Sequence, residues 1–196
     1  MQKLLAVSLA LALSGCGGYD DMDAARLGFD GIGSHGSDKP SVPDKPNDKT
    51  KWEYKSFAST DGIYSLRADN YALNSFYDPQ YQNVKRTPWV QLTKTRSYND
   101  TVEERVVIYA NSSMACIPSC DVRMSFDGNW ATYKMRHSID GVIKPIDEST
   151  EKTLFKKFTT SNKSTVNLPI IGLSEPFGAN FDLSGYDMKR MKFISE

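Results

Sequence analysis

The sequence predicts an all-β fold, an antiparallel β-sandwich with one short helix near its C-terminus, preceded by a disordered tether. From Trp52 onward, short runs of β-branched and aromatic residues alternate with turn signals, as expected of an all-β domain. Residues 17–51 are instead rich in Gly, Asp, Ser, Pro and Lys, with almost no periodic apolar residues. We therefore expect an N-terminal segment 1–15, a flexible tether 16–51 and a β-sandwich domain 52–196.

The clearest strand pair lies in the second half of the chain. Val122, Met124 and Phe126 alternate with polar residues at the period of a strand. Asp127-Gly128 can adopt a turn with positive φ, so residues 130–137 are predicted to return as the partner strand. Further strands are predicted at Val102 to Tyr109, around Val90 and Leu92, at Val142-Ile143 after a second Asp140-Gly141 turn, at Val166 to Ile170, and at Phe177 to Leu183.

One helix is predicted between Ser149 and about Thr159. Ser149 is a residue type that caps helix N-termini, and Glu151 favours the positive end of the helix dipole. Helical spacing brings three apolar side chains to one side, where we expect them to cover an end or edge of the sandwich: Leu154, Phe155 and Phe158.

The first residues have the three parts of a secretory signal: Lys3, an apolar run from Leu4 to Leu13, and small residues before Cys16. The apolar run is about half of the roughly 20 residues that a membrane span needs. The tetrad Leu13-Ser14-Gly15-Cys16 resembles the lipobox of bacterial lipoproteins. The alternative is an ordinary signal peptide with a chance cysteine.

The lipobox resemblance implies that the signal 1–15 is removed and that Cys16 becomes the lipid-bearing first residue. Several acyl chains would anchor the protein stably in a membrane. Gly17, in place of an aspartate, implies sorting to the outer membrane, with the folded domain facing the periplasm.

Cys116 and Cys120 remain after Cys16 is used for lipid. In an exported protein, a pair at this separation is expected to form a disulfide. In the chain-entropy model, a disulfide that closes such a short loop stabilises the fold by about 2 kcal/mol. Two alternatives use the same pair: a redox dithiol, which normally shows Cys-x-x-Cys, and a zinc site, which would need further ligands although His35 and His137 are distant in sequence.

The segment from Tyr64 to Trp89 is the most suggestive surface, because it places aromatic rings among amide side chains. Such rings can anchor a protein partner or stack on sugars. The alternative is that half of them are core residues of the first strands. The candidate binding residues are Tyr71, Phe76, Tyr77, Tyr81 and Trp89.

No catalytic residue, metal ligand or cofactor is predicted. Gly33-Ser34-His35-Gly36 places a serine beside a histidine, but within the tether and without a nucleophile elbow. His137 is expected at the margin of the core, and no phosphate-binding glycine loop is present. The 24 basic and 24 acidic residues balance, which gives no reason to expect a nucleic-acid partner.

The C-terminal part, from Cys120-Asp121-Val122 through the helix to Phe181-Asp182-Leu183-Ser184-Gly185, is similar in layout to a group of bacterial periplasmic β-sandwich proteins. The group includes invasion-associated and type VI secretion accessory proteins. The shared layout is a cysteine-led strand, a hairpin, a short helix and a closing strand. The resemblance implies an accessory role in the cell envelope, but it identifies no functional residues in this chain.

The expected function is therefore a lipid-anchored, non-enzymatic binding or accessory protein of the cell envelope with a protein partner, in a secretion, conjugation or phage-exclusion context. The alternative is a module that binds or cleaves cell-wall glycan, which would need the rings in a groove and, for cleavage, two suitably spaced carboxyl groups. A small-ligand carrier ranks last, because the predicted strands are short and irregular, so no small-molecule ligand is expected.

Overall fold

The large antiparallel sheet dominates the computed structural model, which describes residues 52–60, 62–82, 84–139 and 141–193. The predicted signal 1–15, lipidation site Cys16 and tether 16–51 lie outside the described residues. The strands of the large sheet are β1 (Trp52–Ala58), β2 (Tyr64–Tyr71), β5 (Trp89–Arg96), β6 (Val102–Tyr109), β7 (Ser119–Phe126), β8 (Asn129–Ile139), β9 (Val142–Pro145), β10 (Lys163–Leu168) and β11 (Phe177–Asp182). The smaller elements are the paired strands β3 (Phe76–Tyr77) and β4 (Lys85–Arg86), the helix α1 (Glu148–Thr160) and the 3-10 helix η1 (Met188–Met191).

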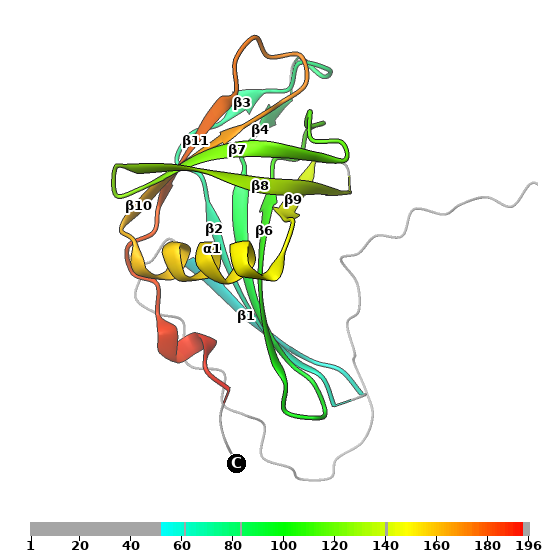
Figure 1. The fold of residues 1–196 in the computed structure, drawn as a ribbon, viewed down its shortest axis with the longest axis vertical. Coiled ribbons are helices and arrows are strands. Elements are labelled where there is room, and N and C mark those ends of the chain that lie inside the picture. Colours follow the sequence, from blue (N-terminus) through cyan, green and yellow to red (C-terminus); the bar gives the residue numbers. More distant parts are fainter. Residues whose placement is uncertain (1–51, 61, 83, 140, 194–196) are drawn as a thin grey trace, which may run out of the picture. The chain divides into compact units, whose positions relative to one another are not determined.

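One continuous sheet folds over to make both layers of the predicted sandwich. Its strand order is β1-β2-β5-β6-β9-β8-β7-β10-β11, with antiparallel pairing throughout. The link between the halves is narrow, because β9 pairs with β6 only at Ile108↔Ile143 and Tyr109↔Val142. Beyond this link β7 and β8 run across the direction of β2 and β6 (Figure 1). The buried apolar side chains of both halves form one core.

Local patterns in the sequence match the strands closely. β6 has the predicted bounds, Val102–Tyr109. The turn between β7 and β8 has positive φ at both Asp127 (50°) and Gly128 (88°), as the Asp-Gly pair predicts. Cys116 and Cys120 form the predicted disulfide, which sits at the start of β7. The all-β prediction is therefore confirmed at the level of fold class and at these elements.

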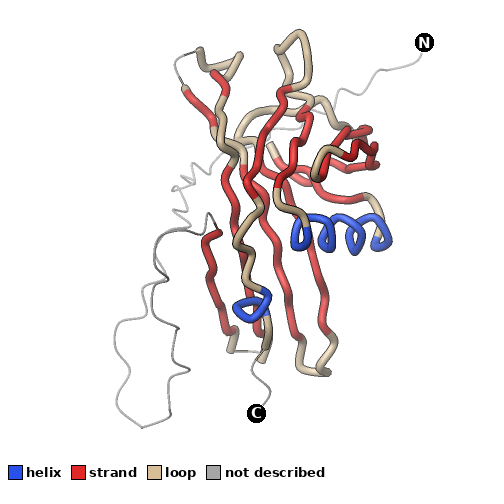
Figure 2. Tube along the Cα trace, turned by 90° about the vertical axis from the view of Figure 1, so that its left-hand side faces the viewer, coloured by secondary structure: helices blue, strands red, loops and turns tan. Residues whose placement is uncertain are grey.

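Helix α1 covers the edge of β6 that β9 leaves unpaired. The Val106 backbone N–H donates to Glu151 Oε1 over 3.1 Å, so a helix side chain replaces the missing strand partner. Leu154, Phe155 and Phe158 are buried as predicted, and the Phe158 ring meets Phe126 edge-on at 5.0 Å. Figure 2 shows α1 lying beside the long strands.

The predicted cap of α1 is wrong by two residues. Asp147, not Ser149, is the N-cap residue: its carboxylate accepts from the Thr150 N–H at 2.8 Å and from the Thr150 hydroxyl at 2.9 Å. The Asp147 carboxylate uses one oxygen for each of the two donors, Oδ1 for the N–H and Oδ2 for the hydroxyl. The helix therefore begins at Glu148, and Ser149 lies within its first turn.

The free edge of β11 is closed by the segment that follows β2. The Leu73 N–H donates to the Asn180 carbonyl at 2.7 Å. The Asn74 side chain donates to the Gly178 carbonyl and accepts from the Asn180 N–H, both at 2.8 Å. The last strand of the sheet is thus joined by hydrogen bonds to the segment after β2, although no strand ladder connects them.

Residues after β11 close the other side of the core. The Trp52 indole N–H donates to the Leu183 carbonyl at 3.1 Å, and its ring meets Tyr186 edge-on at 5.2 Å. Met191 in η1 is buried. The first described strand and the last described helix therefore share one apolar cluster.

The Phe158→Ala variant should lower the free energy of unfolding by about 4 kcal/mol, because it leaves a cavity where α1 meets Phe126. Urea unfolding followed by circular dichroism measures the change. Thr153→Ala, at an exposed position of the same helix, should stay within about 0.5 kcal/mol of the wild type. Equal effects of the two substitutions would mean that α1 does not seal the core.

Candidate binding surface

The five aromatic residues singled out by the sequence occupy three different environments. Tyr77 and Tyr81 are well exposed, at 65% and 60%. Tyr71 is exposed and Trp89 is half-buried, and both lie on the outward face of β2 and β5. Phe76 is buried and packs on Phe177 with ring centroids 4.9 Å apart. Phe76 therefore belongs to the core, and only the other four reach the surface.

An aromatic row crosses the outward face of the first half-sheet. Tyr71, Trp89 and Tyr109 are cross-strand neighbours on β2, β5 and β6. The rings of Trp89 and Tyr109 stack at 4.3 Å with an interplanar angle of 2°, and Tyr71 lies 6.0 Å from Trp89. The Trp89–Tyr109 stack uses one face of each of these two rings, which reduces the aromatic face that a sugar ring could stack on.

A charged network lies beside the aromatic row on the same face. Asp69 is fully buried, and its carboxylate accepts from Arg67 Nε at 2.8 Å and from Gln91 at 3.3 Å. Lys55 Nζ adds an ion pair at 3.8 Å. The Tyr109 hydroxyl donates to the Gln91 amide at 3.2 Å, and burial raises the pKa of Tyr109, which keeps this donor protonated. The network holds the aromatic row in place.

No pattern in the sequence indicates that Asp69 and Tyr109 belong to this face. Both lie within strands whose outward sides were not distinguishable without the cross-strand register. The Tyr109 position was predicted only as the end of a strand.

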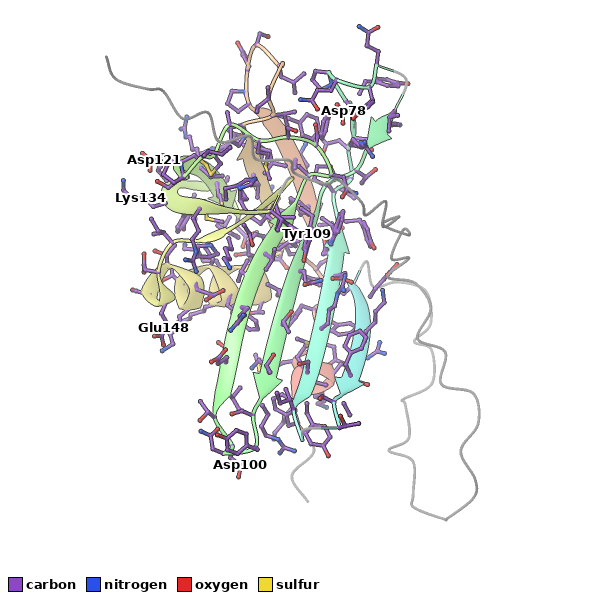
Figure 3. All side chains as sticks on the ribbon, turned by 90° about the vertical axis from the view of Figure 1, so that its right-hand side faces the viewer. Asp78, Asp100, Tyr109, Asp121, Lys134 and Glu148 are labelled. Carbon is purple, nitrogen blue, oxygen red and sulfur yellow. A yellow bond between two sulfur atoms is a disulfide. The ribbon has the colours of Figure 1, made fainter. Side chains whose placement is uncertain are left out.

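The hairpin of β3 and β4 forms a lobe at one end of the molecule. We define the β3–β4 lobe as residues 72–82 and 84–88. Figure 3 shows Asp78 of this lobe beyond the end of the long strands at which Tyr109 lies, whereas Asp100 marks the opposite end. The exposed apolar side chains of the lobe are Leu73, Tyr77, Tyr81 and Val84.

A close contact fixes the connection between β3 and β4 against the loop before β11. A Cβ on Gly172 would lie 2.7 Å from Pro79 Cβ, and Gly172 has a φ of +91°, so only glycine fits there without a shift. Ile171, next to Gly172, is 43% exposed. The apolar surface of this end therefore includes a side chain from a distant segment.

A polar pocket of about 250 Å³ lies between the lobe and the loop that follows β6. Gly141, with a φ of +72°, allows the close approach that shapes this loop, since a Cβ there would lie 3.0 Å from the Ser112 backbone nitrogen. The pocket is lined by Asp78, Gln80, Tyr81, Arg86, Asn111, Ser112 and Ser113.

Asp78 organises the polar pocket. It is only 2% exposed. Its Oδ1 accepts from the Gln80 N–H at 2.9 Å and the Tyr81 N–H at 3.3 Å, and its Oδ2 accepts from Arg86 Nε at 3.1 Å. Burial alone would raise the pKa of Asp78, but these hydrogen bonds and one from Ser112 outweigh burial and hold the pKa below its usual value. Asp78 therefore stays ionised and ties the lobe to the loop after β6.

The remaining candidates carry no recognisable chemistry. His137 is partly buried on β8, and its backbone N–H donates to the Pro118 carbonyl at 3.3 Å, which fits its expected place at the margin of the core. The Gly33–Gly36 motif lies outside the described residues. Across the described part of the chain, no three His, Cys, Asp or Glu side chains gather as a metal site would require. Neither helix there has the length and apolar character of a membrane span.

Comparison of the chain with protein-family models, with curated proteins and with solved structures finds no match.

Replacing Asp78 by Asn should lower the free energy of unfolding by about 2 kcal/mol at pH 7, because the charged hydrogen bonds are lost. A carboxyl group whose pKa is depressed by folding stabilises the protein above its unfolded pKa, about 3.9, and loses that effect as the pH falls through its folded pKa. The difference between wild type and variant should therefore shrink below about pH 4.

Urea unfolding at pH 7 and near pH 3 measures both effects. Asp121→Asn is the matched control, because Asp121 is exposed and has only a 3.8 Å ion pair with Lys134. A difference between wild type and Asp78→Asn that stays constant down to pH 3 would contradict the role assigned to the ionised carboxylate.

Proposed function

We propose that this chain is a lipid-anchored, non-enzymatic binding protein of the bacterial cell envelope that holds a protein partner through the β3–β4 lobe. The observation that carries the proposal is the exposure of Tyr77 and Tyr81 on a lobe that is itself fixed to the sheet. Tyrosine is enriched at the energetic centres of protein interfaces, since it combines apolar area with a polar group at low entropic cost.

The surroundings of the two tyrosines favour a protein over a glycan. The lobe also exposes Leu73 and Val84, and Ile171 adjoins it. Aliphatic side chains beside tyrosines are typical of protein interfaces, whereas a sugar needs a free aromatic face with hydrogen-bonding neighbours. In the aromatic row, Trp89 and Tyr109 each use one ring face for stacking on the other.

The chemistry of the polar pocket supports binding rather than catalysis. The Asp78 carboxylate already accepts hydrogen bonds from four groups, so it has little capacity left to act as a general base. Ser112 and Ser113 line the pocket, but no histidine lines it to activate them.

The proposed location of the protein in the cell envelope rests on the sequence. The Leu13-Ser14-Gly15-Cys16 tetrad supports lipidation at Cys16, and Gly17 supports the outer membrane with the domain facing the periplasm. The Cys116–Cys120 disulfide fits an oxidising compartment. A secretion, conjugation or phage-exclusion system remains the proposed context.

Changing Cys16 to Ala should abolish incorporation of labelled palmitate and leave the signal uncleaved, because the thiol that accepts the lipid is lost. Metabolic labelling and gel mobility measure both. The Cys116→Ala, Cys120→Ala double variant should incorporate palmitate as the wild type does. Undiminished labelling of Cys16→Ala would refute the lipid anchor.

A Tyr77→Ala, Tyr81→Ala double variant should lose at least tenfold in partner capture, since two central interface tyrosines are removed from exposed positions that do not support the core. Crosslinking in intact envelopes followed by purification and mass spectrometry measures capture. Tyr98→Ala is the matched control: Tyr98 is 86% exposed, in the turn between β5 and β6.

Two results would count against the lobe as a protein interface. Equal capture by wild type and double variant would show that the partner binds elsewhere. Recovery of peptidoglycan fragments without a protein partner would favour the glycan-binding alternative.

A further inference from the structure

Arg86 presents an unused edge of its guanidinium group at the polar pocket. Its Nε donates to Asp78 Oδ2 at 3.1 Å, and its side chain is 30% exposed. Because the group is planar and Asp78 takes the Nε side, the two terminal amino groups form a second edge that points away from Asp78. Among the described residues, none accepts a hydrogen bond from those amino groups. The group is held in one orientation while most of its donors remain available.

The pocket around this edge is electrically balanced. Asp78 is ionised and offsets the charge of Arg86, and its oxygens are occupied by their own donors. The other lining groups are neutral, and three of them come from the loop after β6: Asn111, Ser112 and Ser113. The pocket therefore contains one oriented cation, one buried anion behind it and several neutral hydrogen-bonding groups.

We infer that the polar pocket receives the carboxylate of an acidic side chain of the protein partner, held by the terminal amino groups of Arg86; this inference rests on the proposed function. A carboxylate matches the paired donors of a guanidinium edge in a bidentate arrangement. A phosphate dianion would bring twice the charge close to the buried Asp78 carboxylate, which opposes it. A neutral sugar would leave the oriented cation without a matching acceptor charge.

The size and rim of the pocket suit a side chain rather than a free small molecule. Its volume of about 250 Å³ lies below the roughly 300 to 1,000 Å³ of typical ligand sites. Tyr81 both lines the pocket and is exposed on the lobe surface. A partner packed on the lobe tyrosines would exclude water from the Arg86 contact and strengthen it.

The inference is tested by titrating the full chain, in detergent micelles, with N-acetyl-glutamate methylamide and recording amide NMR shifts. We expect saturable shifts at Gln80, Tyr81, Asn111 and Ser112, with a dissociation constant in the millimolar range for such a small fragment. The matched neutral probe, N-acetyl-glutamine methylamide, should bind at least tenfold more weakly.

Three variants locate the contact. Arg86→Gln should abolish the shifts. Arg86→Lys keeps a cation next to Asp78 but lacks the paired amino groups of the guanidinium, so it should weaken binding severalfold while the lobe stays folded. Arg123→Gln is the control, because Arg123 lies outside the pocket, over the Trp130 ring at 4.8 Å. Retained dispersion of the Tyr81 amide in the Arg86 variants shows that the lobe is intact.

Several outcomes would overturn the carboxylate site. These are the absence of saturable shifts in the wild type, equal binding of the glutamine probe, tighter binding of phosphoserine methylamide or of N-acetylglucosamine, and unchanged binding by Arg86→Gln. Because the probe contains no partner protein, a failed titration would reject the pocket assignment while the crosslinking result for Tyr77 and Tyr81 still decides the proposed function.

Discussion

The structure depends on how the free backbone edge of β11 is satisfied. The free edge of a sheet leaves a row of unpaired carbonyl and N–H groups. Such a row costs free energy when it is buried and can pair with another chain when it is exposed. Leu73 and Asn74 supply the missing partners, and the Asn74 amide acts as both donor and acceptor toward β11. This contact also fixes the point at which the chain leaves β2, and hence where the β3–β4 lobe begins.

The lobe needs that fixed starting point because its own strands cannot stabilise it. β3 and β4 pair over only two residues each, and a hairpin of that length is not stable alone in water. Its order comes from side chains instead: Asp78 joins Arg86 and the 80–81 backbone, and Pro79 packs against Gly172. A segment with little regular structure can then present Tyr77 and Tyr81 at defined positions, as binding loops on rigid scaffolds do.

Features decided by local sequence were predictable, and features decided by long-range register were not. The β7–β8 hairpin, the apolar face of α1 and the Cys116–Cys120 bond each depend on residues close together in the chain. The polar pocket joins Asp78 to Ser112, and no sequence period brings those two together. The burial of Phe76 could not be predicted for the same reason, because it depends on Phe177 of β11, which is distant in sequence. The N-cap residue of α1 was predicted wrongly for a local reason. Asp147 and Ser149 are both good capping residues, and only the backbone conformation before the helix decides which of them is the N-cap.

The Asp78–Arg86 pair would link the stability of the lobe to the selectivity of the proposed interface. Asp78 holds the guanidinium in place, and in doing so it also offsets part of the positive charge that a partner carboxylate would meet. In the proposed complex the net gain from that single contact would therefore be modest, and most of the affinity would come from the apolar area around Tyr77 and Tyr81. The proposed contact would matter instead for discrimination. A partner that covers the pocket without an acidic side chain would remove water from the Arg86 amino groups and supply no acceptor, which costs more than the correct contact gains. A surface of tyrosines and aliphatic residues is chemically permissive, and one oriented arginine in the adjoining pocket would make the proposed interface selective.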